Sequence, residues 1–313
     1  MPKATALKSV TIKTMATPVI ELKNVSKRYG SARGIDEVSF KVEPGQVFGF
    51  LGPNGAGKST TINMLVDLIR PSEGKISIFG LDSVIDSLEI RRKIGFLTGD
   101  MSLDESLTGL QQLTYFGNLR GDLPLKRIHQ LAELLQINLA RKIKTLSRGN
   151  RQKVGLISAL MHDPELLILD EPTSGLDPIV QSQFNKIILD HKKSGKTTFM
   201  SSHVLSEVQE ICDQLAFIRD GKILNIQSMS DIGADSPKIV NIVGADSKLI
   251  TKIKALKGAV TDKSNGVKLD LTFAGNINDL LATLAKHDLK DINIQDADLE
   301  AVFMKYYQED KDV

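Results

Sequence analysis

The chain of 313 residues is long enough for one large domain and one small one, and its 41% hydrophobic residues suffice for packed cores. A formal net charge of +2 gives no electrostatic case for a surface that binds nucleic acid, and the single cysteine, Cys212, excludes an intramolecular disulfide. No apolar run approaches the roughly 20 residues that a membrane span requires, so we expect any function at a membrane to need a second chain that spans it.

The first 17 residues carry three lysines among small and polar residues, and we expect a flexible extension here rather than a secretory signal. From Val19 onward, short apolar runs predict strands. Tyr29-Gly30 predicts a turn, and Pro44-Gly45 predicts a hairpin turn. The predicted strands of this part are residues 19–25, 38–42, 47–51, 75–79, 94–97, 166–169 and 197–200, and residues 221–226 close the sheet region.

A glycine-rich segment follows the predicted strand Val47–Leu51 and leads into helical spacing from Thr61 onward. The segment matches the pattern G-x-x-x-x-G-K-[ST] and consists of Gly52, Pro53, Asn54, Gly55, Ala56, Gly57, Lys58, Ser59 and Thr60. Glycines let backbone N–H groups curl around an anion, and the start of a helix adds its positive end. Lys58 can reach the β- and γ-phosphates, while the Ser59 hydroxyl can ligate Mg²⁺. Because strand, turn and helix occur in this order, we predict a nucleoside triphosphate site rather than a turn that binds nothing.

Strands alternate with helices predicted at residues 151–161 and 179–191, which is typical of an α/β domain with a parallel sheet. Residues from about 100 to 162 are mostly helical in pattern and predict an inserted helical subdomain. We therefore predict a large domain over residues 18–230.

Beyond it, residues 231–237 resemble a linker, and residues 238–313 predict a small α+β domain. Its predicted strands are residues 239–243, 259–261, 267–272 and 291–294, and its predicted helices are residues 248–256, 277–287 and 299–307.

The apolar strand Leu166–Leu169 ends in two consecutive carboxylates, Asp170 and Glu171. Burying unpaired charge is costly, so this pair serves little structural purpose at a strand end. Beside a phosphate loop, Asp170 can hold Mg²⁺ or its water, and Glu171 can orient and deprotonate an attacking water. The alternative is a surface turn in which Asp170 only caps, and the phosphate loop makes that alternative weaker.

These motifs resemble the ATP-hydrolysing subunit of an ATP-binding-cassette (ABC) transporter over roughly Val19–Ser228. Leu146–Asn150 resembles the family's signature sequence, Ser174–Asp177 its D-loop, and Ser202-His203 its H-loop. The resemblance implies a phosphate-loop ATPase domain with an antiparallel β subdomain and the helical insertion. It also implies ATP and Mg²⁺ as ligands, and a peripheral location on the cytoplasmic face of a membrane.

The resemblance also implies roles for single residues. Tyr29 would stack on adenine, although an ordinary half-buried tyrosine remains a serious alternative. His203 would contact the γ-phosphate and steady Glu171 and the attacking water.

Other roles implied by the resemblance require a second copy of the chain. Ser147 and Gly149 would cover the γ-phosphate of an ATP bound by the opposite subunit, so that ATP holds a homodimer together. Asp177 would act across the same interface, and with Pro178 it also suits the start of a helix.

The sequence departs from the family pattern in two places. Thr98-Gly99-Asp100 stands where many members have a glutamine, and Arg148 and Asn150 stand where glycine and glutamine are commonest. Arg148 and Asn150 still provide backbone N–H donors, so we expect ATPase activity to be retained with an altered rate. The Thr98–Asp100 variant and the segment Asp298–Phe303 resemble ATPase subunits of antibiotic- and sodium-efflux exporters, which act through a separate transmembrane permease.

The permease could dock on Met101, Leu103 and Leu107, or these side chains could pack into the helical subdomain. Two other functional classes stay open. A soluble ABC ATPase acting on ribosomes or DNA usually carries two cassettes or long coiled-coil insertions, which are missing here, so we expect no nucleic-acid partner. In the other class, the C-terminal unit regulates the ATPase.

Overall fold

The computed structural model describes residues 17–30, 32–99, 101–230, 238–264 and 268–296. Residues 1–16 of the extension predicted over residues 1–17 lie outside the described residues, as do Asp100, the predicted linker 231–237 and the predicted helix 299–307. The chain divides into two compact units, residues 1–226 and residues 227–313.

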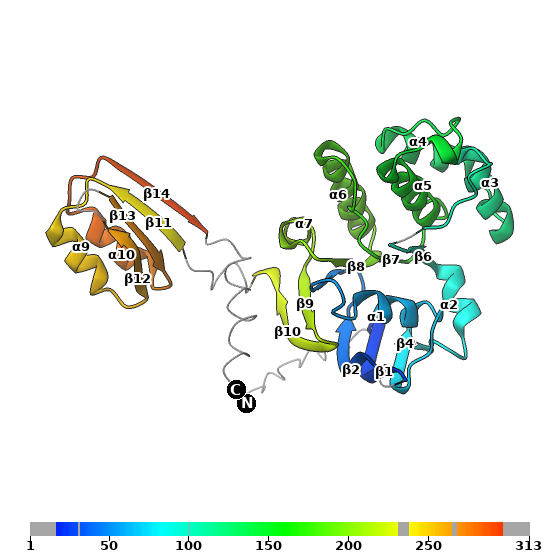
Figure 1. The fold of residues 1–313 in the computed structure, drawn as a ribbon, viewed down its shortest axis with the longest axis horizontal. Helices are drawn as coiled ribbons and strands as arrows, with labels where there is room; N and C mark the ends of the chain where they lie inside the picture. The colour runs from blue at the N-terminus through cyan, green and yellow to red at the C-terminus, as the bar shows by residue number, and fades with distance from the viewer. Residues whose placement is uncertain (1–16, 31, 100, 231–237, 265–267, 297–313) are drawn as a thin grey trace, which may run out of the picture. The chain divides into compact units, whose positions relative to one another are not determined.

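A mainly parallel sheet forms the centre of the first unit (Figure 1). Its strand order is β10-β9-β3-β8-β7-β6, with β3 (Val47–Leu51), β6 (Ile94–Leu97), β7 (Leu166–Leu169), β8 (Thr197–Ser202), β9 (Gln214–Arg219) and β10 (Lys222–Ser228). The pairs β6·β7, β7·β8, β3·β8 and β3·β9 are all parallel. The carboxyl ends of these strands therefore share one edge of the sheet, which is where ligands bind in α/β proteins.

A second, antiparallel sheet has the order β2-β1-β4-β5, with β1 (Ile20–Tyr29), β2 (Ala32–Val42), β4 (Glu73–Ile78) and β5 (Leu81–Asp82). It corresponds to the antiparallel β subdomain that the sequence led us to expect. The hairpin predicted at Pro44-Gly45 is wrong, because β2 pairs with β1 whereas β3 pairs with β8 and β9. The turn at Gly45 (φ 71°) instead carries the chain from one sheet to the other.

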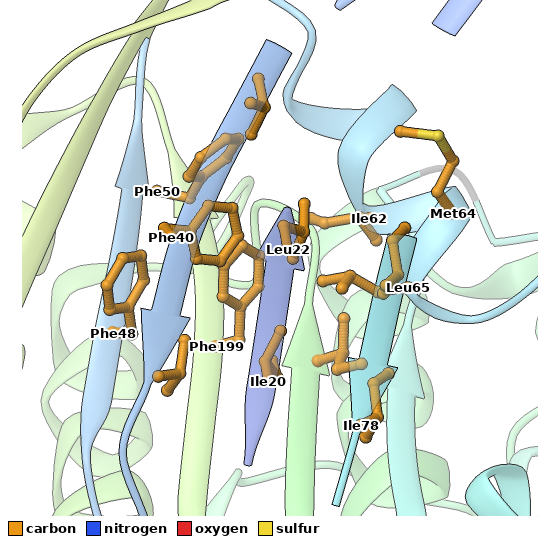
Figure 2. Close-up of a cluster of buried hydrophobic side chains, with 14 of the residues drawn as sticks. Ile20, Leu22, Phe40, Phe48, Phe50, Ile62, Met64, Leu65, Ile78 and Phe199 are labelled. Carbon is orange, nitrogen blue, oxygen red and sulfur yellow. The ribbon is translucent and has the colours of Figure 1, made fainter. Parts of the chain in front are cut away.

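Aromatic rings pack the two sheets together, as Figure 2 shows. Phe40 of the antiparallel sheet stacks on Phe48 and Phe199 of the parallel sheet, with ring centroids 5.3 and 5.8 Å apart. Phe50 also lies 5.6 Å from Phe40. Because Phe48 and Phe50 belong to β3, this core fixes the strand that leads into the glycine-rich segment.

The helices of the first unit are α1 (Lys58–Leu65), α2 (Ser87–Lys93), α3 (Gly109–Arg120), α4 (Leu125–Leu134), α5 (Arg148–Leu160), α6 (Pro178–Lys193) and α7 (Leu205–Gln209). Helices α3, α4 and α5 confirm the helical pattern predicted around residues 100–162. Thr108 and Gln111 form a reciprocal capping box that starts α3. Strand β9 and helices α2 and α7 were not predicted. Among the described residues, no helix combines the length and apolarity needed to cross a bilayer.

The second unit is a small α+β fold, as predicted. Its order is β11 (Lys238–Val243), α9 (Ser247–Lys254), β12 (Ala259–Ser264), β13 (Lys268–Phe273), α10 (Ile277–Leu284) and β14 (Asp291–Asp296). The strands form an antiparallel sheet of order β12-β13-β11-β14, which is the split βαβ arrangement. Alternate residues of the central strands, among them Val240, Ile242, Leu269 and Leu271, pack with Leu249 of α9 in its core.

Candidate active site

The glycine-rich segment forms a loop that closes around the ammonium of Lys58. Lys58 is buried at the start of α1, and its Nζ donates to the carbonyl oxygens of Gly52 at 2.7 Å and Pro53 at 3.2 Å. Gly57 caps the helix at φ 107°, and a Cβ there would lie 2.6 Å from Ile35 Cγ2. Glycine is therefore required at this position for both conformation and space.

This loop lines a cavity of about 250 Å³ in which most of the predicted nucleotide-binding residues meet. Tyr29 lies at the cavity with 48% of its surface exposed, so its ring is available for stacking. The lining consists of Tyr29, Gly34, Asn54, Gly55, Gly57, Lys58, Ser59, Thr60 and Glu171. Of these, only Gly34 was not predicted. A Cβ on Gly34 would lie 2.9 Å from Tyr29 Cε2, so the glycine leaves room for that ring.

The carboxylate of Glu171 lies between two of the predicted residues. Its Oε1 is 3.4 Å from Lys58 Nζ and 3.2 Å from His203 Nδ1. The three side chains come from the loop after β7, the start of α1 and the loop after β8. They meet because the parallel strands end at the same edge of the sheet. Glu171 also has φ 47°, a left-handed conformation that costs energy for a residue with a side chain.

Asp170 is buried beside Glu171 and is held by β8. Ser201 donates its hydroxyl to Asp170 Oδ1 at 2.5 Å. The loop after β6 lies on the other side, since a Cβ on Gly99 would be 3.4 Å from Asp170 Oδ2. The segment that departs from the family pattern, Thr98-Gly99, therefore lies next to this carboxylate.

The signature and D-loop residues do not line the cavity of their own chain. Ser147 caps α5 by accepting a hydrogen bond from the Asn150 N–H at 3.3 Å, and Asp177 caps α6 by accepting from Val180 at 3.0 Å. The two loops contact each other, because a Cβ on Gly149 would lie 2.3 Å from the Gly175 carbonyl oxygen. Gly149 is thus required for close packing against the D-loop.

Two side chains that the sequence analysis did not single out also hold this site. Ser201 accepts a hydrogen bond from the Glu171 N–H at 3.0 Å, and the Gln152 side-chain amide donates to the Glu171 carbonyl at 3.2 Å. The sequence feature that could have pointed to Ser201 is that it is a polar residue two positions before His203. Gln152 had no comparable signal beyond its place in the helix that follows Ser147.

The donor set of the site suits a magnesium ion. Ser59 and Asp170 offer a hydroxyl and a carboxylate, the hard oxygen ligands that Mg²⁺ prefers. Among the described residues, no group of three or more His, Cys, Asp or Glu side chains could hold a metal by itself. Two protein ligands fit a Mg²⁺ ion that takes its remaining ligands from phosphates and water.

The site combines a phosphate loop with a carboxylate pair and a histidine that follow neighbouring strands. These features define the class of protein, a phosphate-loop ATPase. Residues 35–174 match the model of the ABC transporter family. The chain is 39% identical to the uncharacterized ABC transporter ATP-binding protein YhcH of Bacillus subtilis (strain 168) over 69% of this chain and 72% of that protein. It is 30% identical to the bacitracin transport ATP-binding protein BcrA of Enterococcus faecalis over 92% of this chain and 96% of that protein.

A similar fold occurs in a bacterial ABC transporter cassette, MJ0796, whose structure is dimeric. The two have a TM-score of 0.60 and 25% identity over 67% of this chain and 98% of that one. The chain therefore belongs to the ATP-binding proteins of ABC transporters. It is an ABC ATPase, and its cassette has the fold that the sequence predicts.

Proposed function

We propose that this ATPase energises export through a separate membrane-spanning chain, and that two copies of it close on two ATP molecules. The observation that carries the proposal is the meeting of Glu171 Oε1 with Lys58 and His203, at 3.4 and 3.2 Å, at the phosphate-loop cavity. A bacitracin transport ATP-binding protein, which matches most of the chain, supports a role in transport.

Binding of ATP is assigned to the loop, to Lys58 and to Tyr29. The backbone N–H groups of the loop and the positive end of α1 would favour binding of an anion. The Lys58 ammonium is buried where it can pair with phosphate oxygens. Since Lys58 already contacts Gly52, Pro53 and Glu171, phosphate would replace the carboxylate as its anionic partner. Tyr29 offers its ring to the adenine.

Ser59 and Asp170 are the residues that would hold Mg²⁺. The ion, when bound, would neutralise charge on the phosphates during transfer. Ser201 would keep the Asp170 carboxylate turned toward the phosphate loop by donating to its Oδ1.

Glu171 is assigned the role of general base. Its Oε1 would take a proton from the attacking water, and His203 would contact the same carboxylate and the γ-phosphate through its ring. Glu171 is only partly buried, so water has access to the carboxylate.

Ser147, Gly149 and Asp177 are assigned to the ATP bound by a second copy. They do not line the cavity of their own chain, and Ser147 lies at the start of α5, whose first N–H groups would favour an anion. The dimeric solved relative supports this arrangement.

The membrane partner is assigned to a groove on the first unit rather than to Leu103. Leu103 is buried, and the Met101 sulfur would lie 2.9 Å from a Cβ on Gly155 of α5, so these two side chains pack within the first unit. A cavity of about 310 Å³ instead opens between the segment that follows α1 and the elements α2, β6, α3 and α5. Its lining is apolar with a basic rim and consists of Val66, Leu68, Arg91, Ile94, Phe96, Phe116, Leu119, Arg120, Ser158, Met161 and His162.

Two features favour this groove as the docking site. Leu68 and Leu119 are 61% and 68% exposed beside the other apolar side chains of the lining, and a contiguous exposed apolar patch marks an interaction site. Phe96 of the groove also lies two residues before Thr98, in the strand that leads to the loop beside Asp170. A partner bound here would therefore contact the strand that carries this loop.

Replacing Leu119 with aspartate should abolish stimulation of the ATPase by the membrane-spanning chain that copurifies with it, because a charge would be buried in the apolar contact. Basal ATPase activity of the Leu119→Asp protein should stay unchanged, since the residue lies outside the nucleotide cavity. The measurement is ATP hydrolysis with and without the membrane chain in proteoliposomes. Ile85→Asp is the matched control, because Ile85 is 82% exposed and does not line the groove. Full stimulation of the Leu119→Asp protein would rule out the groove.

The proposed function as a whole is tested in the same proteoliposomes. We expect substrate to be transported, in an ATP-dependent way, from the membrane side that carries the ATPase to the opposite side. This transport should be lost when this chain is left out. The proposed function would be contradicted if the chain hydrolysed ATP without forming a dimer. It would also be contradicted if the membrane chain left the rate of ATP hydrolysis unchanged.

A further inference from the structure

The main chain at Glu171 is held from two sides. Its left-handed conformation, φ 47°, is unfavourable for a residue with a side chain and persists only where neighbours enforce it. The N–H donates to Ser201 Oγ at 3.0 Å, and the carbonyl accepts from Gln152 Nε2 at 3.2 Å.

Ser201 connects Glu171 to Asp170 through a single hydroxyl. The side chain is fully buried in β8, and its proton goes to Asp170 Oδ1 at 2.5 Å. A hydroxyl can donate one hydrogen bond and accept others, so Ser201 donates to Asp170 and accepts from Glu171 at the same time. The position of the Glu171 main chain and the orientation of the Asp170 carboxylate are thereby linked.

Gln152 connects the same turn to α5. It is buried, and its amide also donates to the Pro172 carbonyl at 3.3 Å. Gln152 lies in the second turn of the helix that Ser147 caps. A movement of α5 would therefore displace the carbonyl of Glu171 through these hydrogen bonds.

We propose that Ser201 and Gln152 are positioning residues for ATP hydrolysis, and that Gln152 ties the Glu171 turn to the helix that begins at the signature sequence. The proposal rests on the proposed roles of Asp170 and Glu171. In a dimer, α5 would then connect the ATP covered by Ser147 with the Glu171 of its own chain.

The test compares Ser201→Ala and Gln152→Met in the full chain, with Thr198→Val as a control. Thr198 is also a buried hydroxyl of β8, but it contacts His191 rather than the site. Each variant removes two hydrogen bonds, and a combined loss of about 1.4 kcal/mol corresponds to about a tenfold loss of rate. At saturating Mg²⁺, we expect kcat to fall about tenfold in Ser201→Ala and Gln152→Met, with the KM for ATP within twofold, because Lys58 and its loop are untouched. Thr198→Val should keep the kcat of the unmodified protein.

A second readout separates the two residues. Mn²⁺ binding to the ADP-loaded protein, followed by electron paramagnetic resonance, should weaken several-fold in Ser201→Ala, because only Ser201 contacts Asp170. It should be unchanged in Gln152→Met. Unaltered kcat and Mn²⁺ affinity in Ser201→Ala, or an equal loss of kcat in Thr198→Val, would overturn the proposal. Failure of the Glu171 assignment is recognised separately, by normal turnover in Glu171→Gln, whereas the Mn²⁺ measurement reports on Ser201 and Asp170 alone.

Discussion

In the Glu171→Gln variant, ATP should remain bound while kcat falls about a thousandfold, the range expected when a general base is removed. Glutamine has the shape of glutamate but cannot accept a proton from the attacking water. Lys58 and the glycine-rich loop remain in place, so the binding of phosphate is retained. Loss of a carboxylate 3.4 Å from Lys58 also removes a negative charge that competes with phosphate for the ammonium. ATP affinity should therefore be equal to that of the unmodified protein or higher.

The same variant should accumulate as a dimer in the presence of ATP and Mg²⁺, because slow hydrolysis no longer separates the two copies. Single-turnover hydrolysis gives the rate, and light scattering gives the oligomeric state. Glu165→Gln is a suitable control, since Glu165 is an exposed glutamate that precedes β7 at the opposite end of the strand. Turnover at the normal rate in Glu171→Gln would remove Glu171 as the base.

The parts of the site that could be predicted are those whose geometry is encoded locally. Gly57 has φ 107°, a conformation that glycine adopts readily, so its identity follows from the shape of the loop itself. The strand before Asp170 could likewise be recognised from its own residues, Leu166–Leu169, all of which are buried. In both cases a few consecutive residues carry the information.

The parts that could not be predicted depend on which strands become neighbours. Ser201 is 30 positions from Glu171 and Gln152 is 19 positions from it, so their contacts exist only once β8 lies beside β7 and α5 packs against the turn. The Pro44-Gly45 turn was misjudged for the same reason. A turn between two strands has the same sequence features whether the strands pair with each other or join different sheets.

The choice between docking and packing for Leu103 also required the structure. An apolar residue in a loop is compatible with either, and it is the burial of Leu103 in the structure that favours packing. The exposed Leu68 and Leu119 belong to segments that the sequence assigns to ordinary amphipathic helices. Nothing in their spacing distinguishes a face that packs from a face that stays open.

The Lys58→Ala variant should lose ATP affinity by about a hundredfold, equivalent to roughly 2.7 kcal/mol. Hydrogen bonds from a charged donor contribute about 1.5–3 kcal/mol each, and Lys58 is the buried ammonium at the cavity. The carbonyls of Gly52 and Pro53 would also lose their donor, so the loop would be less well ordered for phosphate. Titration with a fluorescent ATP analogue measures the effect, and Lys23→Ala, an exposed lysine of β1, is the control.

Adenosine distinguishes a lost phosphate contact from a damaged site. Tyr29 and the cavity wall near it do not depend on the ammonium, so the weak binding of an adenosine analogue should be the same in Lys58→Ala and in the unmodified protein. Lys58→Arg should not restore ATP affinity, because a planar guanidinium cannot occupy the space in which a compact ammonium reaches two carbonyls at 2.7 and 3.2 Å. Since Glu171→Gln retains ATP and Lys58→Ala loses it, the two variants separate chemistry from binding at side chains only 3.4 Å apart. An ATP affinity that survives the loss of Lys58 would mean that the phosphates bind elsewhere than in this loop.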